Sequence, residues 1–179
     1  MTDDRSITLV LGGARSGKTR HGLMLAEGHR EAGRQTVYIA TAEARDDEMR
    51  ARIDHHKKER DSNWKTVDAP FDLAAAIAGN SAPNTCLLVD CLTLWATNLL
   101  LAEKDAESET STLVDALKSA KGPVILVTNE VGLGIVPENA LARRFRDMAG
   151  RLNQDIAAIA DRVIFIAAGL PLVLKGETD

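Results

Sequence analysis

The sequence predicts an α/β fold, with a mostly parallel central sheet and helices on both faces. Short runs of aliphatic and β-branched residues alternate along the chain with segments of helical periodicity. These runs are apolar throughout, which is typical of central strands buried on both faces. The first run leads directly into a glycine-rich segment, GGARSGKT at 12–19, which opens the first predicted helix.

Five strands are predicted from the apolar runs, and a shorter sixth from WKTV at 64–67. The five are rich in valine, isoleucine and leucine, and the second adds a tyrosine, as strands favour. In chain order they are ITLVL at 7–11, TVYIAT at 36–41, TCLLV at 85–89, PVILVT at 123–128 and VIFIA at 163–167.

Helices are predicted between the strands, where apolar residues recur every three or four positions. They cover 18–32, 45–60, 71–79, 92–102, 109–120 and 138–161. The last is the clearest, because Phe145, Met148, Leu152 and Ile156 step along one face. The polar segment EKDAESET at 103–110 predicts a surface loop rather than a domain boundary.

Length and composition describe one globular domain covering 1–179. The chain is 45% hydrophobic and 27% charged, and its net charge of −4 argues against broad nucleic-acid binding. Its two cysteines, Cys86 and Cys91, are too few for a disulfide scaffold or a four-ligand zinc site, so we expect reduced thiols near the core.

The amino terminus does not look like a signal peptide. No stretch approaches the roughly 18–20 apolar residues of a spanning helix, so we expect a cytoplasmic protein without a membrane span.

The glycine-rich segment matches G-x-x-x-x-G-K-[ST], the phosphate loop of P-loop NTPases. Gly12 and Gly17 allow the backbone to approach an anion, Lys18 reaches the outer phosphates, and Thr19 is placed to ligate Mg²⁺. The alternative is an ordinary strand–helix turn, but the preceding strand and following helix favour phosphate binding. The predicted phosphate-binding residues are Gly12, Gly13, Ala14, Arg15, Ser16, Gly17, Lys18 and Thr19.

Asp90 ends the apolar run at 85–89, where a P-loop enzyme needs an acid to hold Mg²⁺ directly or through water. The simpler alternative is a cap for the helix that begins at Leu92. Together with a phosphate loop, the metal-linked role is favoured, so Thr19 and Asp90 are the predicted metal ligands.

The predicted helix at 45–60 carries two adjacent histidines. Met49, Ile53 and His56 share one face within about 40°, whereas His55 lies about 100° away. If that face packs inward, His56 points toward the protein. A neutral imidazole beside cations is a plausible nucleophile toward phosphorus, although a buried structural histidine or a solvated helix end would give the same pattern. The cations that follow are Lys57, Lys58 and Arg60.

A glycine-containing loop follows the run at 123–128, at the edge where open α/β sheets bind ligands. Asn129 and Glu130 begin this loop. Two roles are equally compatible with the sequence: contact with a ligand, or hydrogen bonds to the loop's own backbone.

Together these segments closely resemble the bifunctional adenosylcobinamide kinase / adenosylcobinamide-phosphate guanylyltransferase family of cobalamin biosynthesis. The resemblance spans nearly the whole chain in the expected order. It rests on GGARSGKT at 12–19, YIATAEARDDEMRARIDHHKKER at 38–60, LLVDCLTLWATNLL at 87–100 and VTNEVGLGIVPENALARRFRDMAGRLNQ at 127–154.

The resemblance implies two reactions. The aminopropanol hydroxyl of adenosylcobinamide is phosphorylated by ATP or GTP, and GMP is then transferred from GTP to the new phosphate, giving adenosylcobinamide-GDP and pyrophosphate. In this family the guanylyl group passes through the second histidine of the pair, which maps to His56. The resemblance also implies a RecA-like fold, a homotrimer, and Mg²⁺ with the nucleotides.

The family's GTP contacts map onto several further positions besides the phosphate loop. Asp68 among them departs mildly from the pattern, because Glu is expected there in related sequences. The mapped contacts are Ala40, Thr41, Ala42, Lys57, Lys58, Glu59, Arg60, Asp68 and Asp90.

Two other functions remain as alternatives. A single-activity P-loop kinase acting on another small alcohol would explain the loop and Asp90, but would leave the segment HHKKER without a role. A nucleotide-binding regulatory module is less favoured, because a GTPase switch usually has an N-K-x-D segment and the nearest candidate, TNEV at 128–131, does not match.

Overall fold

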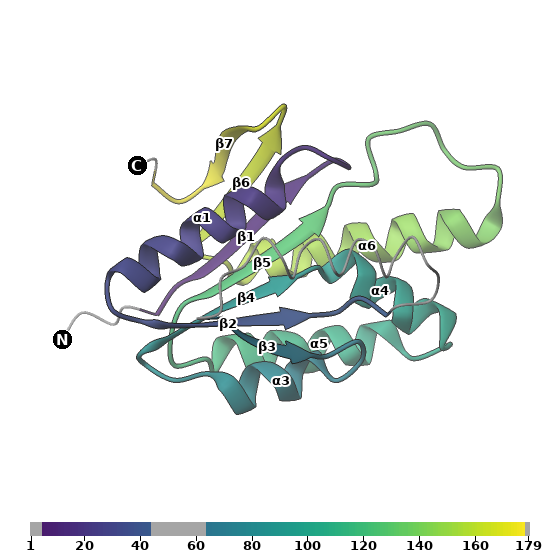
Figure 1. Cartoon of the computed structure of the whole chain (residues 1–179). Helices are drawn as coiled ribbons and strands as arrows, with labels where there is room; N and C mark the ends of the chain where they lie inside the picture. Colours follow the sequence, from purple (N-terminus) through teal and green to yellow (C-terminus); the bar gives the residue numbers. More distant parts are fainter. Residues whose placement is uncertain (1–4, 44–63, 178–179) are drawn as a thin grey trace.

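The structure, a computed structural model, describes residues 5–43 and 64–177. Within these residues seven strands form one sheet in the order β3-β2-β4-β5-β1-β6-β7 (Figure 1). All neighbouring strands are parallel except β6 and β7, so the predicted mostly parallel sheet is confirmed. The strands are β1 (Ile7–Gly12), β2 (Gln35–Ala40), β3 (Lys65–Asp68), β4 (Thr85–Asp90), β5 (Val124–Asn129), β6 (Arg162–Ala167) and β7 (Leu170–Lys175).

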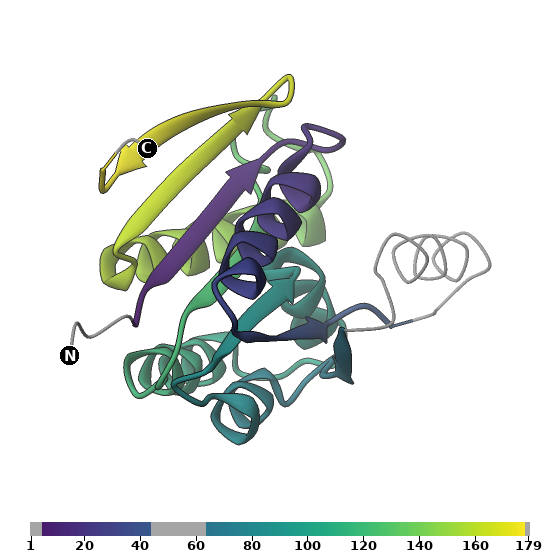
Figure 2. The same cartoon turned by 60° about the vertical axis from the view of Figure 1, so that its left-hand side comes forward.

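Helices cover both faces of the sheet, as predicted (Figures 1 and 2). The first helix packs on one face, against β1, β2, β4 and β5, and the other four lie on the opposite face. The described helices are α1 (Lys18–Glu31), α3 (Leu73–Asn80), α4 (Leu92–Leu101), α5 (Ala106–Lys118) and α6 (Ala140–Ile159). None of the helices within the described residues has the length and apolar character needed to cross a membrane.

Alternate residues of each central strand fill two separate cores. In β4, Leu87 and Val89 pack in the core beneath α3, α4, α5 and α6, whereas Cys86 and Leu88 pack in the core beneath α1. All four side chains are fully buried. Because both faces of the strand are covered, its run is apolar throughout instead of alternating with polar residues.

The strand β7 is absent from the sequence prediction. It runs antiparallel beside β6 at the edge of the sheet, and most of its side chains are exposed. Pro171 lies within it, and proline lowers the expectation of a strand because it lacks an N–H donor. An edge strand tolerates this residue, because one side of its backbone pairs with no other strand of the described sheet.

The segment 103–110 is a loop only in its first part, so the prediction is corrected there. The helix α5 begins at Ala106, and the Asp105 carboxylate caps it by accepting hydrogen bonds from the backbone N–H groups of Glu107 and Ser108. An aspartate that accepts such bonds stabilises a helix start. The predicted helix at 45–60 lies outside the described residues.

Candidate nucleotide site at the carboxyl edge of the sheet

The phosphate loop joins β1 to α1 and contains two positions that require glycine. A Cβ on Gly12 would lie 2.4 Å from Ser16 Oγ and 2.7 Å from the Ile166 carbonyl oxygen. Gly17 precedes α1 with φ +96°, a conformation that L side chains rarely adopt. No side chain among the described residues caps this helix start. The first amides of α1 are therefore available to an anion, as the motif predicts.

Lys18 is the first residue of α1 and only 9% exposed. Its ammonium donates a hydrogen bond to the Gly13 carbonyl oxygen, at 3.0 Å. Burial lowers the pKa of Lys18 from its usual 10.5, and the nearby Cys91 and Asp90 partly oppose that shift. A phosphate beside this ammonium would offset the cost of burying its charge.

Asp90 ends β4 on the face of the sheet that α1 covers. Alternation along the strand sets this orientation, because Leu88 packs in the α1 core and the next residue on that face is Asp90. The carboxylate accepts a hydrogen bond from the Tyr38 hydroxyl, with 2.9 Å between the oxygens. Tyr38 is 5% exposed, and its ring stands edge-on to Trp64, with 6.4 Å between centroids.

Sequence reasoning missed Tyr38 as a partner of Asp90. The residue is the single tyrosine of the chain and lies in a predicted strand, but only strand order brings it to the acid. β2 pairs with β4, and Tyr38 stands opposite Leu88, two residues before Asp90. Residues two apart on neighbouring strands share one face, which puts the hydroxyl within reach of the carboxylate.

β5 lies between β1 and β4, so its end separates the phosphate loop from Asp90. Asn129 pairs with Gly12 in the register of β1 and β5. The next residue, Glu130, donates its backbone N–H to the Gly12 carbonyl oxygen at 3.1 Å. Its carboxylate accepts from the Gly132 N–H at 2.5 Å. Of the two roles open for Glu130, the structure therefore shows the loop-holding one.

The side chains of Thr128 and Asn129 point to opposite faces of the sheet, because successive residues of a strand alternate. Thr128 belongs to a buried polar network on the side of α4 and α6. Its hydroxyl hydrogen-bonds to Asn153 Oδ1 at 2.9 Å and lies 3.3 Å from the Thr93 hydroxyl. Thr93 also accepts from the Asn129 N–H at 2.6 Å, and Asn153 donates to the Asn129 carbonyl at 3.2 Å. These bonds fix the Asn129 backbone, and strand alternation directs its side chain to the face of the sheet that also carries Asp90.

The predicted contacts at the end of β2 occupy the same edge. Thr41 is fully buried, and its hydroxyl donates to the Cys91 carbonyl oxygen and accepts from the Cys91 N–H. Its own carbonyl accepts from the Asn98 side chain at 2.8 Å. Thr41 thus ties the ends of β2 and β4 together, while Ala40 and Ala42 flank it, partly exposed.

Asp68 ends β3 at the far edge of the sheet and is exposed. The strands β2, β4 and β5 separate it from β1. Four inter-strand steps correspond to about 19 Å, so the structure does not bring Asp68 to the phosphate loop. His56 and the predicted contacts Lys57, Lys58, Glu59 and Arg60 lie outside the described residues.

The donor groups at this edge fit Mg²⁺. Thr19 in the first turn of α1 offers a hydroxyl and Asp90 a carboxylate, and no group of three or more His, Cys, Asp or Glu side chains within residues 5–43 and 64–177 could hold a metal by itself. Mg²⁺ is usually held by one or two protein oxygens together with substrate phosphates. The site therefore suits a metal that arrives with a nucleotide.

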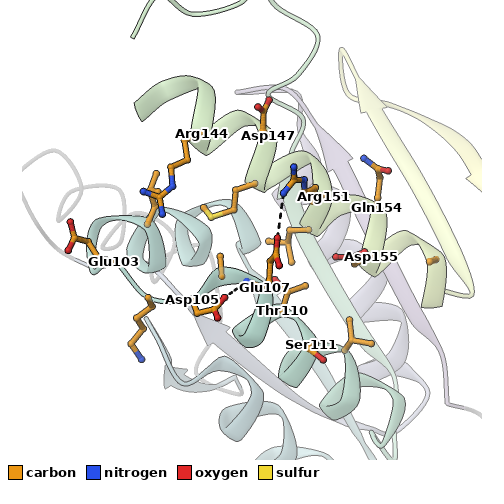
Figure 3. A pocket seen from close by; sticks show the side chains of 17 residues that line it. Glu103, Asp105, Glu107, Thr110, Ser111, Arg144, Asp147, Arg151, Gln154 and Asp155 are labelled. Atoms are coloured by element: carbon orange, nitrogen blue, oxygen red, sulfur yellow. Dashed lines mark hydrogen bonds and ion pairs between the residues drawn. The ribbon is translucent and has the colours of Figure 1, made fainter. Parts of the chain in front are cut away.

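A second concave region lies between α5 and α6 (Figure 3). Its walls carry charges of both signs, including an ion pair in which 3.5 Å separates Arg151 Nη1 from Glu107 Oε1. The two helices cover the face opposite to α1, and no predicted site residue from the described part of the chain lines this groove. It is separate from the nucleotide site.

Two solved structures with low sequence identity share the fold. The flagellar accessory protein FlaH from Methanocaldococcus jannaschii superposes with a TM-score of 0.55 at 13% identity, covering 96% of this chain and 79% of that one. A solved ATPase domain superposes with a TM-score of 0.53 at 14% identity, covering 90% of this chain and 69% of that one. These similarities show a P-loop NTPase fold, as the sequence predicts, and nothing about substrate.

Sequence relatives are much closer. The protein is 48% identical to the bifunctional adenosylcobalamin biosynthesis protein CobP of Pseudomonas aeruginosa, over 94% of this chain and 97% of that protein. It is 43% identical to the bifunctional adenosylcobalamin biosynthesis protein CobU of Salmonella typhimurium, over 93% and 98%. The model of the family described as cobinamide kinase / cobinamide phosphate guanyltransferase matches residues 8–174. The chain therefore belongs to the cobinamide kinase / cobinamide phosphate guanyltransferase family.

Proposed function

We propose that this protein carries both activities of its family in cobalamin biosynthesis. It phosphorylates adenosylcobinamide with ATP or GTP, and then transfers GMP from GTP to adenosylcobinamide phosphate, releasing pyrophosphate. Membership of the family supports the reaction class. The structural observation that supports the proposal is that Lys18, at the start of α1, lies close enough to Asp90, at the end of β4, for the Asp90 carboxylate to raise the Lys18 pKa against the effect of burial.

In the kinase reaction the phosphate loop binds the triphosphate and orients its γ-phosphorus toward the substrate hydroxyl. The free amides at the start of α1 and the Lys18 ammonium neutralise charge that develops on the leaving diphosphate. Thr19 and Asp90 would hold Mg²⁺, which when bound supplies further charge neutralisation at the phosphates. Tyr38 keeps the Asp90 carboxylate oriented for that role by its hydrogen bond.

Asn129 ends β5, the strand between β1 and β4, and its side-chain amide is the third group that we propose for the site. An amide has both a donor and an acceptor, so it can donate to a phosphate oxygen while accepting from a water or a substrate hydroxyl. The Thr93–Thr128–Asn153 network holds its backbone in place before the nucleotide arrives. A polar group fixed in advance loses little entropy on binding, which favours a direct contact with the terminal phosphate.

In the transferase reaction His56 is the proposed nucleophile. Its imidazole nitrogen forms a bond to the α-phosphorus of GTP as the bond to the pyrophosphate oxygen breaks, which gives a guanylyl-histidine. The phosphate of adenosylcobinamide phosphate then attacks the same phosphorus and releases the free histidine. The family resemblance supports the role of His56. The same resemblance supports the other proposed GTP contacts, which are Lys57, Lys58, Glu59 and Arg60 beside it in the sequence and Ala40, Thr41, Ala42 and Asp68 elsewhere.

Turnover by the purified protein tests the proposal. With adenosylcobinamide, Mg²⁺ and ATP or GTP supplied separately, chromatography should show the phosphorylated corrinoid, and GTP should add adenosylcobinamide-GDP and an equal amount of pyrophosphate. Lys18→Ala should impair both reactions. A single-activity kinase would give the phosphorylated product without pyrophosphate, and a regulatory module would bind nucleotide without either product.

A homotrimer in the cytoplasm is the proposed state of the protein. Exposed apolar side chains on the segment after β5 support self-association, because Leu133 is 83% and Ile135 98% exposed. Light scattering on the purified protein should give three times the mass of the 19.3 kDa chain. Leu133→Ser combined with Ile135→Ser should lower that mass if this segment lies in the interface.

A further inference from the structure

The turn between β6 and β7 packs against the phosphate loop (Figures 1 and 2). The Gly169 N–H donates a hydrogen bond to the Ser16 carbonyl oxygen at 2.8 Å. A Cβ on Gly17 would lie 3.3 Å from the Gly169 Cα, so the two backbones approach closely. Sequence reasoning did not find this contact, because the strand after the turn was not predicted.

The hydrogen bond sets the direction of an amide in the phosphate loop. The Ser16 carbonyl and the Gly17 N–H belong to one planar peptide unit and point in opposite directions. When the carbonyl is held toward Gly169, the Gly17 N–H is turned away from the β6–β7 turn. Rotation of this peptide would remove one donor from the loop, and a phosphate site depends on its amide donors converging.

The backbone conformation of the β6–β7 turn directs the Gly169 N–H toward the Ser16 carbonyl. Ala168 and Gly169 have φ values of +51° and +79°, the left-handed pair found in tight two-residue hairpins. Glycine adopts such a conformation without steric cost, whereas a residue with a Cβ is strained in it. Among residues 5–43 and 64–177, a Cβ at Gly169 would meet only the Arg20 guanidinium, at 3.6 Å, so substitution there would act through the backbone and not through a clash.

We propose that Gly169 is a positioning residue for the phosphate loop, acting through the Ser16 carbonyl, and that nucleotide binding and docking of the β6–β7 hairpin stabilise each other. The inference rests on the proposed nucleotide site and adds a structural partner to it. The hairpin suits such coupling because β7 is an edge strand with exposed side chains, so little burial holds it in place. Coupling between two sites is reciprocal, so a nucleotide that needs the turn in place must also hold it there.

A pair of matched glycine substitutions tests the coupling. Gly33 ends the turn after α1 with φ +90°, and a Cβ added to it would meet no atom of the described residues within 4 Å, so Gly33→Ala creates the same backbone strain away from the loop. Both Gly169→Ala and Gly33→Ala should lower the melting temperature by similar amounts. Only Gly169→Ala should weaken binding of a non-hydrolysable GTP analogue, by about 3- to 10-fold, the range for one lost hydrogen bond.

Steady-state kinetics should repeat this separation. Gly169→Ala should raise the KM for the nucleotide by a similar factor while kcat at saturation stays within about twofold, because a saturating nucleotide restores the loop. Ala168→Gly, which removes strain from the same turn and keeps the Gly169 N–H, should bind the analogue as the wild type does. Equal affinities for Gly169→Ala and Gly33→Ala would overturn the inference.

Hydrogen exchange on the wild-type protein gives an independent measurement if Gly169→Ala fails to fold. The GTP analogue should slow hydrogen exchange of the Gly169 amide and of the β7 amides at least about 3- to 10-fold, the factor by which Gly169→Ala is expected to weaken binding of the analogue. Unchanged exchange would overturn the coupling. Wild-type protein that binds no nucleotide would defeat the proposed function as well. Wild-type binding and turnover with no difference at Gly169 would defeat only this inference.

Discussion

Replacing Tyr38 with phenylalanine removes one hydroxyl from the site and leaves the ring in place. The hydroxyl donates to the Asp90 carboxylate at 2.9 Å, and the residue is only 5% exposed. A hydrogen bond to a charged group contributes about 1.5–3 kcal/mol to stability. Asp90 is partly exposed, so water can replace the lost donor there. We therefore expect the free energy of unfolding to fall by about 1 kcal/mol.

The effect on activity should be larger than the effect on stability. Removing an outer partner of a metal-ligating carboxylate typically costs 10- to 100-fold in metal affinity or activity. Tyr38→Phe should therefore raise the Mg²⁺ concentration for half-maximal kinase activity by about tenfold, with the nucleotide KM at saturating Mg²⁺ within about threefold of wild type. The assay is the initial rate of adenosylcobinamide phosphorylation, titrated with Mg²⁺ and with nucleotide.

Thr36→Val is a matched control on the same strand. The Thr36 side chain is 3% exposed and its hydroxyl has no hydrogen-bond partner among the described residues. Removing that hydroxyl should leave the Mg²⁺ dependence unchanged and the stability equal or higher, because an unpaired buried polar group is lost. If Tyr38→Phe keeps the wild-type Mg²⁺ dependence while Asp90→Asn loses activity, the hydrogen bond does not position the carboxylate and the reasoning fails.

Three further outcomes follow from the described contacts. Lys18→Met should reduce nucleotide affinity at least about tenfold. The ligand-free variant should keep or gain thermal stability, because the substitution removes a charge that burial has desolvated. A large drop in its melting temperature would contradict this. Thr128→Val should lower the free energy of unfolding by about 1–3 kcal/mol in a denaturant titration, since Asn153 loses a buried partner, and unchanged stability would count against the network. Burial raises the pKa values of Cys86 and Cys91 from 9.0 to about 12, so both thiols stay protonated at pH 8. Iodoacetamide reacts with thiolates, so mass spectrometry should show neither cysteine labelled until the protein unfolds. Rapid labelling of the folded protein would contradict the burial of these thiols.

The sequence predicts most of the sheet because its central strands are buried on both faces. Runs such as TCLLV at 85–89 are apolar throughout, and a strand covered on both faces has this pattern. The phosphate loop is equally readable, because a Cβ on Gly12 would lie 2.7 Å from the Ile166 carbonyl oxygen and Gly17 has a positive φ that other residues rarely adopt. Local chemistry sets both features, so they are visible without the tertiary structure.

Features that depend on strand order were not visible in the sequence. Tyr38 reaches Asp90 only because β2 pairs with β4, and Asn129 lies beside the phosphate loop only because β5 sits between β1 and β4. β7 was missed because an exposed edge strand containing a proline lacks the pattern of a buried one. The start of α5 was missed because its first turn is polar, and Asp105 signals it only as a cap. The mechanistic role of His56 stays a prediction from the resemblance.

Covalent labelling tests most directly whether the phosphate loop binds the phosphates of GTP while His56 attacks the α-phosphorus. Protein incubated with Mg²⁺ and GTP labelled at the α-phosphate should acquire an acid-labile label, which moves to the corrinoid when adenosylcobinamide phosphate is added. His55→Ala should keep the label, and His56→Ala and Lys18→Ala should lose it. A label that survives in His56→Ala, or that never forms on a wild-type protein active in guanylyl transfer, would contradict the account.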